Sequence, residues 1–174
     1  MEPLAYRMKP RTLDEFFGQE DIISKDKLLY RLIKADKLTS AIFWGPPGCG
    51  KTSLARIIAS TTKNKFVSLN ATTSGVSDIK QVVEEAQNIF TNPTGKVILF
   101  IDEIHRFNKL QQDALLPHVE KGTVILIGAT TENPYFSVNK ALISRSTVFK
   151  FSELKKEDVK NILKNCLQNK ERGL

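Results

Sequence analysis

The chain has no long hydrophobic run and very few cysteines, and both shortages limit its class. No stretch of its 174 residues approaches the roughly 20 consecutive apolar residues that a membrane-spanning helix needs. The Met1 end lacks the apolar core of a signal peptide. The two cysteines, Cys49 and Cys166, lie far apart and make no disulfide framework. We therefore expect a protein with no membrane partner, in a reduced, cytoplasmic setting.

The rest of the composition is that of an ordinary globular domain. Hydrophobic residues make up 41% of the chain and charged residues 26%, and the length suits one domain with a sizeable core. Lysine and arginine exceed the acidic residues by 26 to 19, which gives a net charge of +7. This excess is compatible with a polyanionic partner such as nucleic acid, but it does not identify one.

Five short apolar runs alternate with amphipathic helical patterns along the chain. The runs are 41–44, 66–69, 97–101, 124–127 and 148–151. Strands that are apolar throughout and alternate with helices predict a parallel sheet that is covered on both faces. The expected fold is a three-layer α/β fold with a five-stranded parallel sheet. Residues 1–40 form an N-terminal segment and helix of the core, 41–151 its main part, and 152–174 the start of a further helical unit.

Three helices are predicted from their spacing. Ser77 and Asp78 are expected to open a helix whose apolar face runs from Ile79 to Phe90. A second helix places Phe107, Leu110, Ala114 and Leu115 on one face, and Pro117 is expected to close or kink it. The last, around Val159 to Leu167, has no later segment to pack against. The chain therefore looks like a domain cut from something longer.

The strongest signal is a glycine-rich loop directly after the first apolar run. It matches G-x-x-x-x-G-K-[ST] between a predicted strand and a predicted helix that begins near Ser53. Such a loop aims backbone N–H groups at phosphates, and the following helix adds its positive end. The residues of the pattern are Gly45, Pro46, Pro47, Gly48, Cys49, Gly50, Lys51 and Thr52.

This loop predicts a site for ATP and Mg²⁺. Lys51 is expected to reach the β- and γ-phosphates, and the Thr52 hydroxyl to be a ligand of Mg²⁺. Cys49 is expected to contribute only its backbone N–H, the alternative being a reactive thiol at a helix N-terminus. A glycine-rich turn with a chance lysine would not require this strand, loop and helix context.

A pair of acidic residues follows the third apolar run. Asp102 and Glu103 end the buried run Val97–Ile101, so the strand delivers them to its carboxyl end, where parallel sheets bind ligands. Asp102 is expected to hold Mg²⁺, directly or through water, and Glu103 to polarise the water that attacks the γ-phosphate. A solvated acidic turn is the alternative, but the phosphate loop supplies the other half of a site.

With both motifs, the chain resembles an AAA+ ATPase. The run Asp102 to Asn108 and the segment Gln111 to Glu120 narrow the resemblance to the replication-associated recombination protein A (RarA/MgsA) family. That family is related to clamp loaders and to the Holliday-junction branch-migration motor. Residues 3–8 with Gly18-Gln19, and the segment Gly128 to Pro134, carry the same resemblance. It covers roughly residues 3–151.

The resemblance implies two further catalytic roles. Thr130 or Thr131 would be the polar sensor of the γ-phosphate or the attacking water, the alternative being a threonine that caps a turn. Arg145 matches the arginine finger, which reaches the nucleotide of a neighbouring subunit. The alternative for Arg145 is a surface salt bridge.

Other implied roles have nearly equal rivals. Asn70 would hold the catalytic glutamate inactive until DNA or a partner binds, or it is a simple turn residue. The residues that would enclose adenine and ribose are Pro3, Leu4, Arg7 and Ile22. Packing against the sheet explains these positions nearly as well. The histidines His105 and His118 are interpreted as helix-surface or interface residues rather than zinc ligands.

The resemblance implies an ATPase module that acts at stalled replication forks or DNA ends. The intact protein would bind DNA and form a homo-oligomer, for which the resemblance suggests a tetramer, and would interact with single-stranded-DNA-binding protein near the nucleoid. Two alternatives stay open: a clamp-loader subunit or Holliday-junction motor, and a nucleotide-dependent scaffold with little turnover. Relatives continue into a lid with a second sensor arginine, so this shorter chain is expected to hydrolyse ATP weakly.

Overall fold

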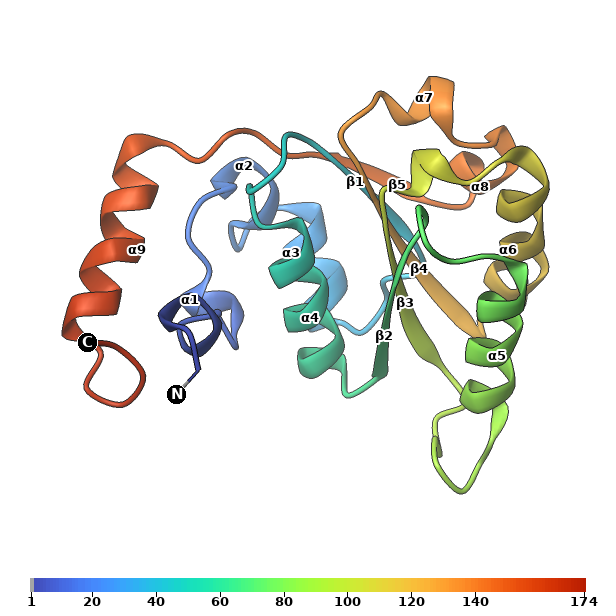
Figure 1. Cartoon of the computed structure of the whole chain (residues 1–174), viewed down its shortest axis with the longest axis horizontal. Helices are drawn as coiled ribbons and strands as arrows, with labels where there is room; N and C mark the ends of the chain where they lie inside the picture. The colour runs from blue at the N-terminus through green and yellow to red at the C-terminus, as the bar shows by residue number, and fades with distance from the viewer. Residues whose placement is uncertain (1) are drawn as a thin grey trace.

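The computed structural model describes residues 2–174, and its centre is a five-stranded parallel sheet (Figure 1). The strands lie in the order β2-β3-β4-β1-β5, and every neighbouring pair is parallel. This confirms the predicted fold class. The strands are β1 (Ala41–Trp44), β2 (Lys65–Asn70), β3 (Val97–Asp102), β4 (Val124–Thr130) and β5 (Thr147–Lys150).

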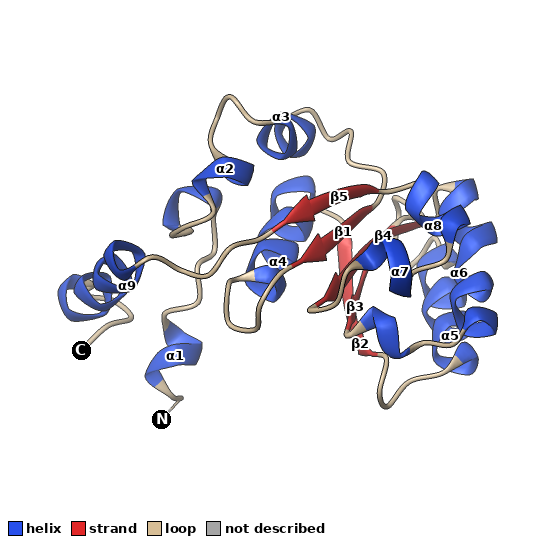
Figure 2. Cartoon of the chain, turned by 90° about the horizontal axis from the view of Figure 1, so that it is seen from above, coloured by secondary structure: helices blue, strands red, loops and turns tan. Residues whose placement is uncertain are grey.

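Helices cover both faces of the sheet and bury two separate apolar cores (Figure 2). On one face, α3 (Leu28–Lys34) and α4 (Lys51–Thr62) pack on strand residues such as Phe43. On the other, α5 (Val76–Gln87) and α6 (Lys109–Lys121) pack on the alternate positions, such as Ile42. Because neighbouring strand residues point to opposite faces, a fully apolar strand supplies both cores.

Shorter elements surround these layers. They are α1 (Leu4–Arg7), η1 (Leu13–Glu15), α2 (Glu20–Ile23), η2 (Ile104–Arg106), α7 (Pro134–Ser137) and α8 (Lys140–Ser144). The last helix, α9 (Lys156–Gln168), lies away from the sheet and beside α1 (Figures 1 and 2). Within residues 2–174, no helix combines the length and the apolar character needed to cross a bilayer.

The prediction for the ends of α5 was wrong. Gly75, not Ser77, occupies the position before the helix, and its backbone N–H donates to the Asp78 carboxylate at 2.8 Å. The helix stops before Phe90, which is exposed. The reason is local: the Asn88 side chain accepts the backbone N–H of Phe90 at 3.1 Å and offers the chain a turn instead of another helical residue.

The prediction for α6 also needs correction at both ends. Asn108 caps its start, where the side chain accepts the Gln111 N–H at 2.8 Å. Phe107 is therefore buried in front of the helix, and Leu110 is exposed. Pro117 does not close the helix, which runs on to Lys121. Pro117 is exposed, so water can satisfy the carbonyl that its missing N–H leaves free.

Candidate functional site

The glycine-rich loop joins the carboxyl end of β1 to the first turn of α4. Two of its glycines have left-handed backbones, Gly48 with φ of 74° and Gly50 with φ of 103°. At Gly45 the reason for glycine is space, because an added Cβ would lie 2.7 Å from the Cβ of Phe151. The loop thus has the backbone freedom and the helix N-terminus that phosphate binding needs.

Lys51 lies in the first turn of α4 and folds over the loop. Its ammonium donates to the carbonyl oxygen of Gly45 at 2.5 Å and reaches that of Thr130 at 3.4 Å. Both acceptors are carbonyl groups at the ends of strands. The charge is therefore held at the mouth of the loop, where a β- or γ-phosphate could replace the carbonyl oxygens as its partner.

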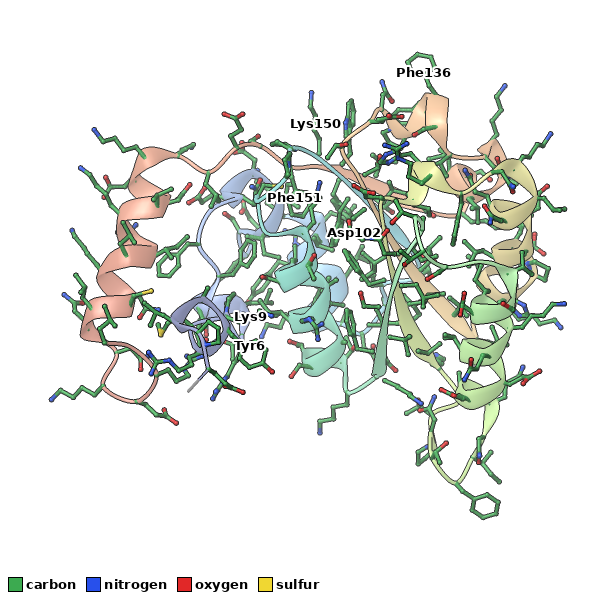
Figure 3. The ribbon with its side chains drawn as sticks, viewed as in Figure 1. Tyr6, Lys9, Asp102, Phe136, Lys150 and Phe151 are labelled. Atoms are coloured by element: carbon green, nitrogen blue, oxygen red, sulfur yellow. The ribbon has the colours of Figure 1, made fainter. Side chains whose placement is uncertain are left out.

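The acidic pair lies at the same edge of the sheet. Asp102 is the last residue of β3, and Figure 3 shows it at the upper end of the strands. Its carboxylate accepts the backbone N–H of Glu103 at 3.0 Å. Glu103 has a left-handed backbone, with φ of 53°, which turns the chain from the strand into η2. A non-glycine residue held in this conformation is strained, which is common at functional sites.

These parts line one cavity of about 510 Å³. Its inner wall is the carboxyl edge of the sheet with the loop, namely Pro47, Gly48, Cys49, Gly50, Lys51, Thr52, Ser53, Asp102, Glu103, Thr130 and Thr131. Its outer wall comes from the two ends of the chain, namely Met8, Pro10, Glu15, Phe16, Phe17, Leu154, Ile162, Asn165 and Cys166. The volume falls in the range of ordinary small-ligand sites.

The two candidate sensor threonines have different surroundings. The Thr130 side chain is buried, and its hydroxyl lies 2.8 Å from Nδ1 of His105 and accepts the Glu132 N–H at 3.0 Å. Thr131 is exposed and lines the cavity. The His105 side chain is 7% exposed, so it packs inward against Thr130 and does not lie on a helix surface. An interface role for His105 stays a prediction. The other histidine, His118, lies in α6. Its pKa is lowered mainly by burial and to a smaller extent by the nearby Lys121 charge.

Asn70 is engaged in a turn. Its side-chain oxygen accepts the backbone N–H of Thr72 at 2.9 Å and the Thr72 hydroxyl at 2.6 Å. Strand register places Asn70 next to Asp102, one residue from Glu103. The turn interpretation thus describes this structure, and the restraint of Glu103 by Asn70 stays a prediction.

Arg145 is far from the phosphate loop of its own chain. It lies just before the amino end of β5, whereas the loop follows the carboxyl end of β1, which pairs with β5 in parallel. Its guanidinium forms an ion pair with Glu120 at 2.9 Å, on a half-exposed surface. The surface salt bridge is therefore present, and a finger role would require the nucleotide of another subunit.

The residues predicted around adenine lie outside the cavity lining. Ile22 packs in the core beside α3, and Leu4 and Arg7 belong to α1. The cavity instead offers the apolar side chains of its outer wall, among them Met8 and Phe16. Contact of the three predicted residues with a base stays a prediction. Packing of the N-terminal segment decides that Met8 and Phe16, rather than Leu4 and Arg7, face the cavity.

Cys49 lines the cavity with its backbone while its thiol is buried in the core. Burial raises the pKa of this thiol, and the nearby Lys51 charge opposes the effect only in part. A raised pKa leaves less of the reactive thiolate. The structure thus favours a passive loop residue over a reactive thiol.

Comparisons with known proteins agree with this geometry. Residues 41–154 match the ATPase family associated with various cellular activities (AAA). Replication-associated recombination protein A of Coxiella burnetii is 54% identical over 172 residues, which are 99% of this chain and 38% of that protein. ATPase WRNIP1 of Dictyostelium discoideum is 51% identical over 95% of this chain and 19% of its own length. The chain thus spans well under half of these relatives.

A solved structure of a related protein also matches the fold of this chain. The RuvB Holliday junction branch migration motor of Thermotoga maritima superposes with a TM-score of 0.74 and 28% identity. The match covers 92% of this chain and 54% of RuvB. The shared part is therefore an ATPase module that relatives carry together with further segments.

Proposed function

The chain belongs to the AAA family of ATPases, and about half of its residues are identical to those of relatives named for replication-associated recombination. We propose that it is the ATP-hydrolysing module of a longer protein. That protein would remodel DNA or protein at stalled replication forks or DNA ends. One observation carries the proposal: a single cavity joins the phosphate loop, Lys51, Asp102 and Glu103. These are the groups that phosphoryl transfer to water requires.

The residues present fit Mg²⁺ and a nucleoside triphosphate. The hydroxyl of Thr52 and the carboxylate of Asp102 are hard oxygen ligands on the same cavity, the kind that Mg²⁺ takes alongside phosphate oxygens. When bound, the ion would supply positive charge that offsets the negative charge of the phosphates. The apolar outer wall, with Met8 and Phe16, suits a flat base.

Each polar side chain of the cavity has a separate role in the proposed hydrolysis of ATP. Glu103 accepts a proton from the attacking water, and the ammonium of Lys51 moves from carbonyl oxygens to phosphate oxygens. Thr131 is the better sensor of the two threonines, because its hydroxyl makes no hydrogen bond within residues 2–174, whereas that of Thr130 does. Thr130 and His105 then support the segment that carries Thr131.

Arg145 would complete the site in a neighbouring copy. Its position at the opposite edge of the sheet supports action between subunits, so a single chain would hydrolyse ATP weakly. The intact protein would be a homo-oligomer, and a tetramer is one arrangement. It would bind DNA and single-stranded-DNA-binding protein in the nucleoid region of the cytoplasm. The net charge of +7 supports a polyanionic partner.

The alternatives fit less well. The names of relatives near 50% identity favour replication-associated recombination over a clamp loader or the branch-migration motor, which shares 28% identity. A scaffold without turnover has no need of a strained glutamate beside the phosphate loop. We therefore keep the ATPase as the proposal.

The decisive experiment separates binding from hydrolysis. In an oligomeric chain extended through the lid, Glu103→Gln should lower ATP turnover by about 10²- to 10⁴-fold while ATP affinity stays within a few-fold. Glu84→Gln, on the exposed side of α5, is the matched control and should change neither. Equal loss of binding and turnover in Glu103→Gln would exclude the role of Glu103 as the base.

A second arm tests the role between subunits. Mixing Arg145→Ala with Glu103→Gln subunits should restore part of the turnover, because a mixed ring contains pairs in which an intact finger faces an intact base. Turnover of the Arg145→Ala protein equal to that of the wild type would remove the finger role. Stimulation of turnover by forked or single-stranded DNA tests the proposed substrate, and indifference to DNA would leave only the ATPase.

A further inference from the structure

Gln19 is a buried amide whose hydrogen-bonding groups are all used. Its side chain is 7% exposed, and its backbone is left-handed, with φ of 59°. The side-chain NH₂ donates to the carbonyl of Cys49 at 3.2 Å and to that of Ser152 at 2.6 Å. The side-chain oxygen accepts the Ser152 N–H at 2.9 Å. Neither motif of the nucleotide site includes this residue.

The two bonds to Ser152 extend the sheet beyond its last strand. Phe151, just after β5, still donates its N–H to the Trp44 carbonyl, and Ser152 is the next residue. The Gln19 amide pairs with both the N–H and the C=O of Ser152, as a peptide group of a neighbouring strand would. It therefore fixes the start of the connection that leads to α9.

The third bond fixes a peptide of the phosphate loop. In a planar trans peptide, the C=O of Cys49 and the N–H of Gly50 point in opposite directions. Because Gln19 holds the Cys49 carbonyl from behind the loop, the Gly50 N–H is aimed away from Gln19, toward the phosphate side. A flip of this peptide would place a carbonyl oxygen against the phosphates, which is electrostatically unfavourable.

Neighbours of Gln19 touch the same two structures. The ring of Phe16 packs against Gly50, where an added Cβ would lie only 2.7 Å from Cζ of the ring. At Gly18 an added Cβ would lie 2.8 Å from Leu154, in the connection to α9. The segment 16–19 thus contacts both the phosphate loop and the connection to the last helix.

We propose that Gln19 is a positioning residue, whose amide orients the Cys49–Gly50 peptide for phosphate binding and ties it to the connection that carries α9. The proposal rests on the proposed nucleotide-binding function of the loop. It assigns Gln19 no contact with the nucleotide. Its effect is expected mainly on the β-phosphate, because the Gly50 N–H directly precedes Lys51, the residue of the pattern that reaches the β- and γ-phosphates.

The test uses the chain itself and two nucleotides that differ by one phosphate. Gln19→Met keeps the length of the side chain and removes its hydrogen bonds. Affinity for Mg·ADP, measured by titration with a fluorescent ADP analogue and competition, should fall about tenfold. Affinity for AMP should fall much less, so the ratio of the two dissociation constants shrinks. The exposed Gln87→Met is the matched control and should change neither.

Thermal unfolding shows which variants are folded at the temperature of the titration. Should Gln19→Met fail to fold, Gln19→Asn keeps an amide but is one methylene too short for all three bonds, and the same loss of ADP affinity is expected. A folded variant that binds ADP within twofold of the wild type would overturn the proposal, as would equal loss for ADP and AMP. If the wild-type chain binds no ADP, the proposed function itself fails.

Discussion

The two walls of the nucleotide cavity are built in different ways. The inner wall consists of three short segments, 47–53, 102–103 and 130–131, which the parallel sheet holds side by side at the ends of β1, β3 and β4. The outer wall joins the two ends of the chain, and its contacts span long distances in sequence. Gln19 and Ser152 are 133 positions apart, and Glu15 and Arg172 are 157 apart.

The difference also extends to burial. The strands that carry the inner wall supply residues to both cores, whereas α9 of the outer wall keeps Val159, Leu163 and Leu167 exposed. An inner wall fixed by local backbone geometry can hold phosphates and a metal ion rigidly. An outer wall fixed by a few long-range contacts can change its position when the nucleotide changes. The predictions below test this contrast.

The largest effect is expected at Gly45, the first residue of the phosphate loop that continues into the inner wall. Its Cβ position lies 2.7 Å from the Cβ and 2.8 Å from the carbonyl oxygen of Phe151, so Gly45→Ala forces the backbone of two strands apart. We expect a loss of about 3 kcal/mol in the free energy of unfolding, measured by urea denaturation. Gly75→Ser, at an open position, should stay within about 0.5 kcal/mol. Similar losses in both variants would contradict the rigid inner wall.

A smaller effect is expected at Phe16 in the outer wall. The ring packs on Gly50 and on the core but is only partly buried, so Phe16→Ala should cost about 2 kcal/mol. ADP affinity should fall as well, because the ring lines the cavity and packs against Gly50 of the loop. Phe136→Ala is the control, since Phe136 projects from α7 into solvent (Figure 3) and is expected to cost less than about 0.5 kcal/mol. Equal costs for the two rings would remove the support role.

The same contrast explains what sequence could predict. The phosphate loop and the Asp102-Glu103 pair follow from strand, turn and helix rules that act over a few residues, and the structure brings them into one cavity. The outer wall depends on which side of α1 and of the segment before α2 faces inward. That choice is made by packing against α9, so the pattern around Leu4 and Arg7 could not determine it.

Helix ends show the same limit at smaller scale. Asn88 and Asn108 end α5 and begin α6 through side-chain bonds to nearby N–H groups, and these asparagines override an apolar spacing that would include Phe90 and Phe107. The importance of Gln19 was also missed. A glutamine after Gly18 is visible in the sequence, but its two distant partners are not.

Each wall contains one cysteine, and the two thiols are expected to differ in reactivity. Cys49 of the loop is buried and its pKa is raised by burial, so less thiolate forms at any given pH. Cys166 of α9 is partly exposed. We expect iodoacetamide at pH 8 to label Cys166 about tenfold faster or more, as measured by peptide mass spectrometry. In 6 M urea the two rates should converge, and equal rates in the folded chain would contradict the burial of Cys49.

The smallest effect is expected where the C-terminal end meets the N-terminal segment. The Arg11 backbone N–H and the Arg172 guanidinium lower the pKa of Glu15, and Arg172 pairs with Glu15 at 3.0 Å. A lowered pKa adds stability that is present above the ordinary value of 4.5 and is lost as pH falls through the lowered value. At pH 7, Arg172→Gln should therefore cost about 0.5 kcal/mol in the free energy of unfolding.

The pH dependence separates this ion pair from the other contact of Arg172. As pH falls and Glu15 becomes protonated, the difference between wild type and Arg172→Gln should shrink. It should not vanish, because Arg172 also donates to the carbonyl of Lys9 at 3.1 Å, and that bond does not titrate. Lys170→Gln removes the same charge nearby from an exposed side chain and should show no such pH dependence. A constant difference from pH 7 to pH 3 would mean that Arg172 acts through its bond to the Lys9 carbonyl and not through Glu15.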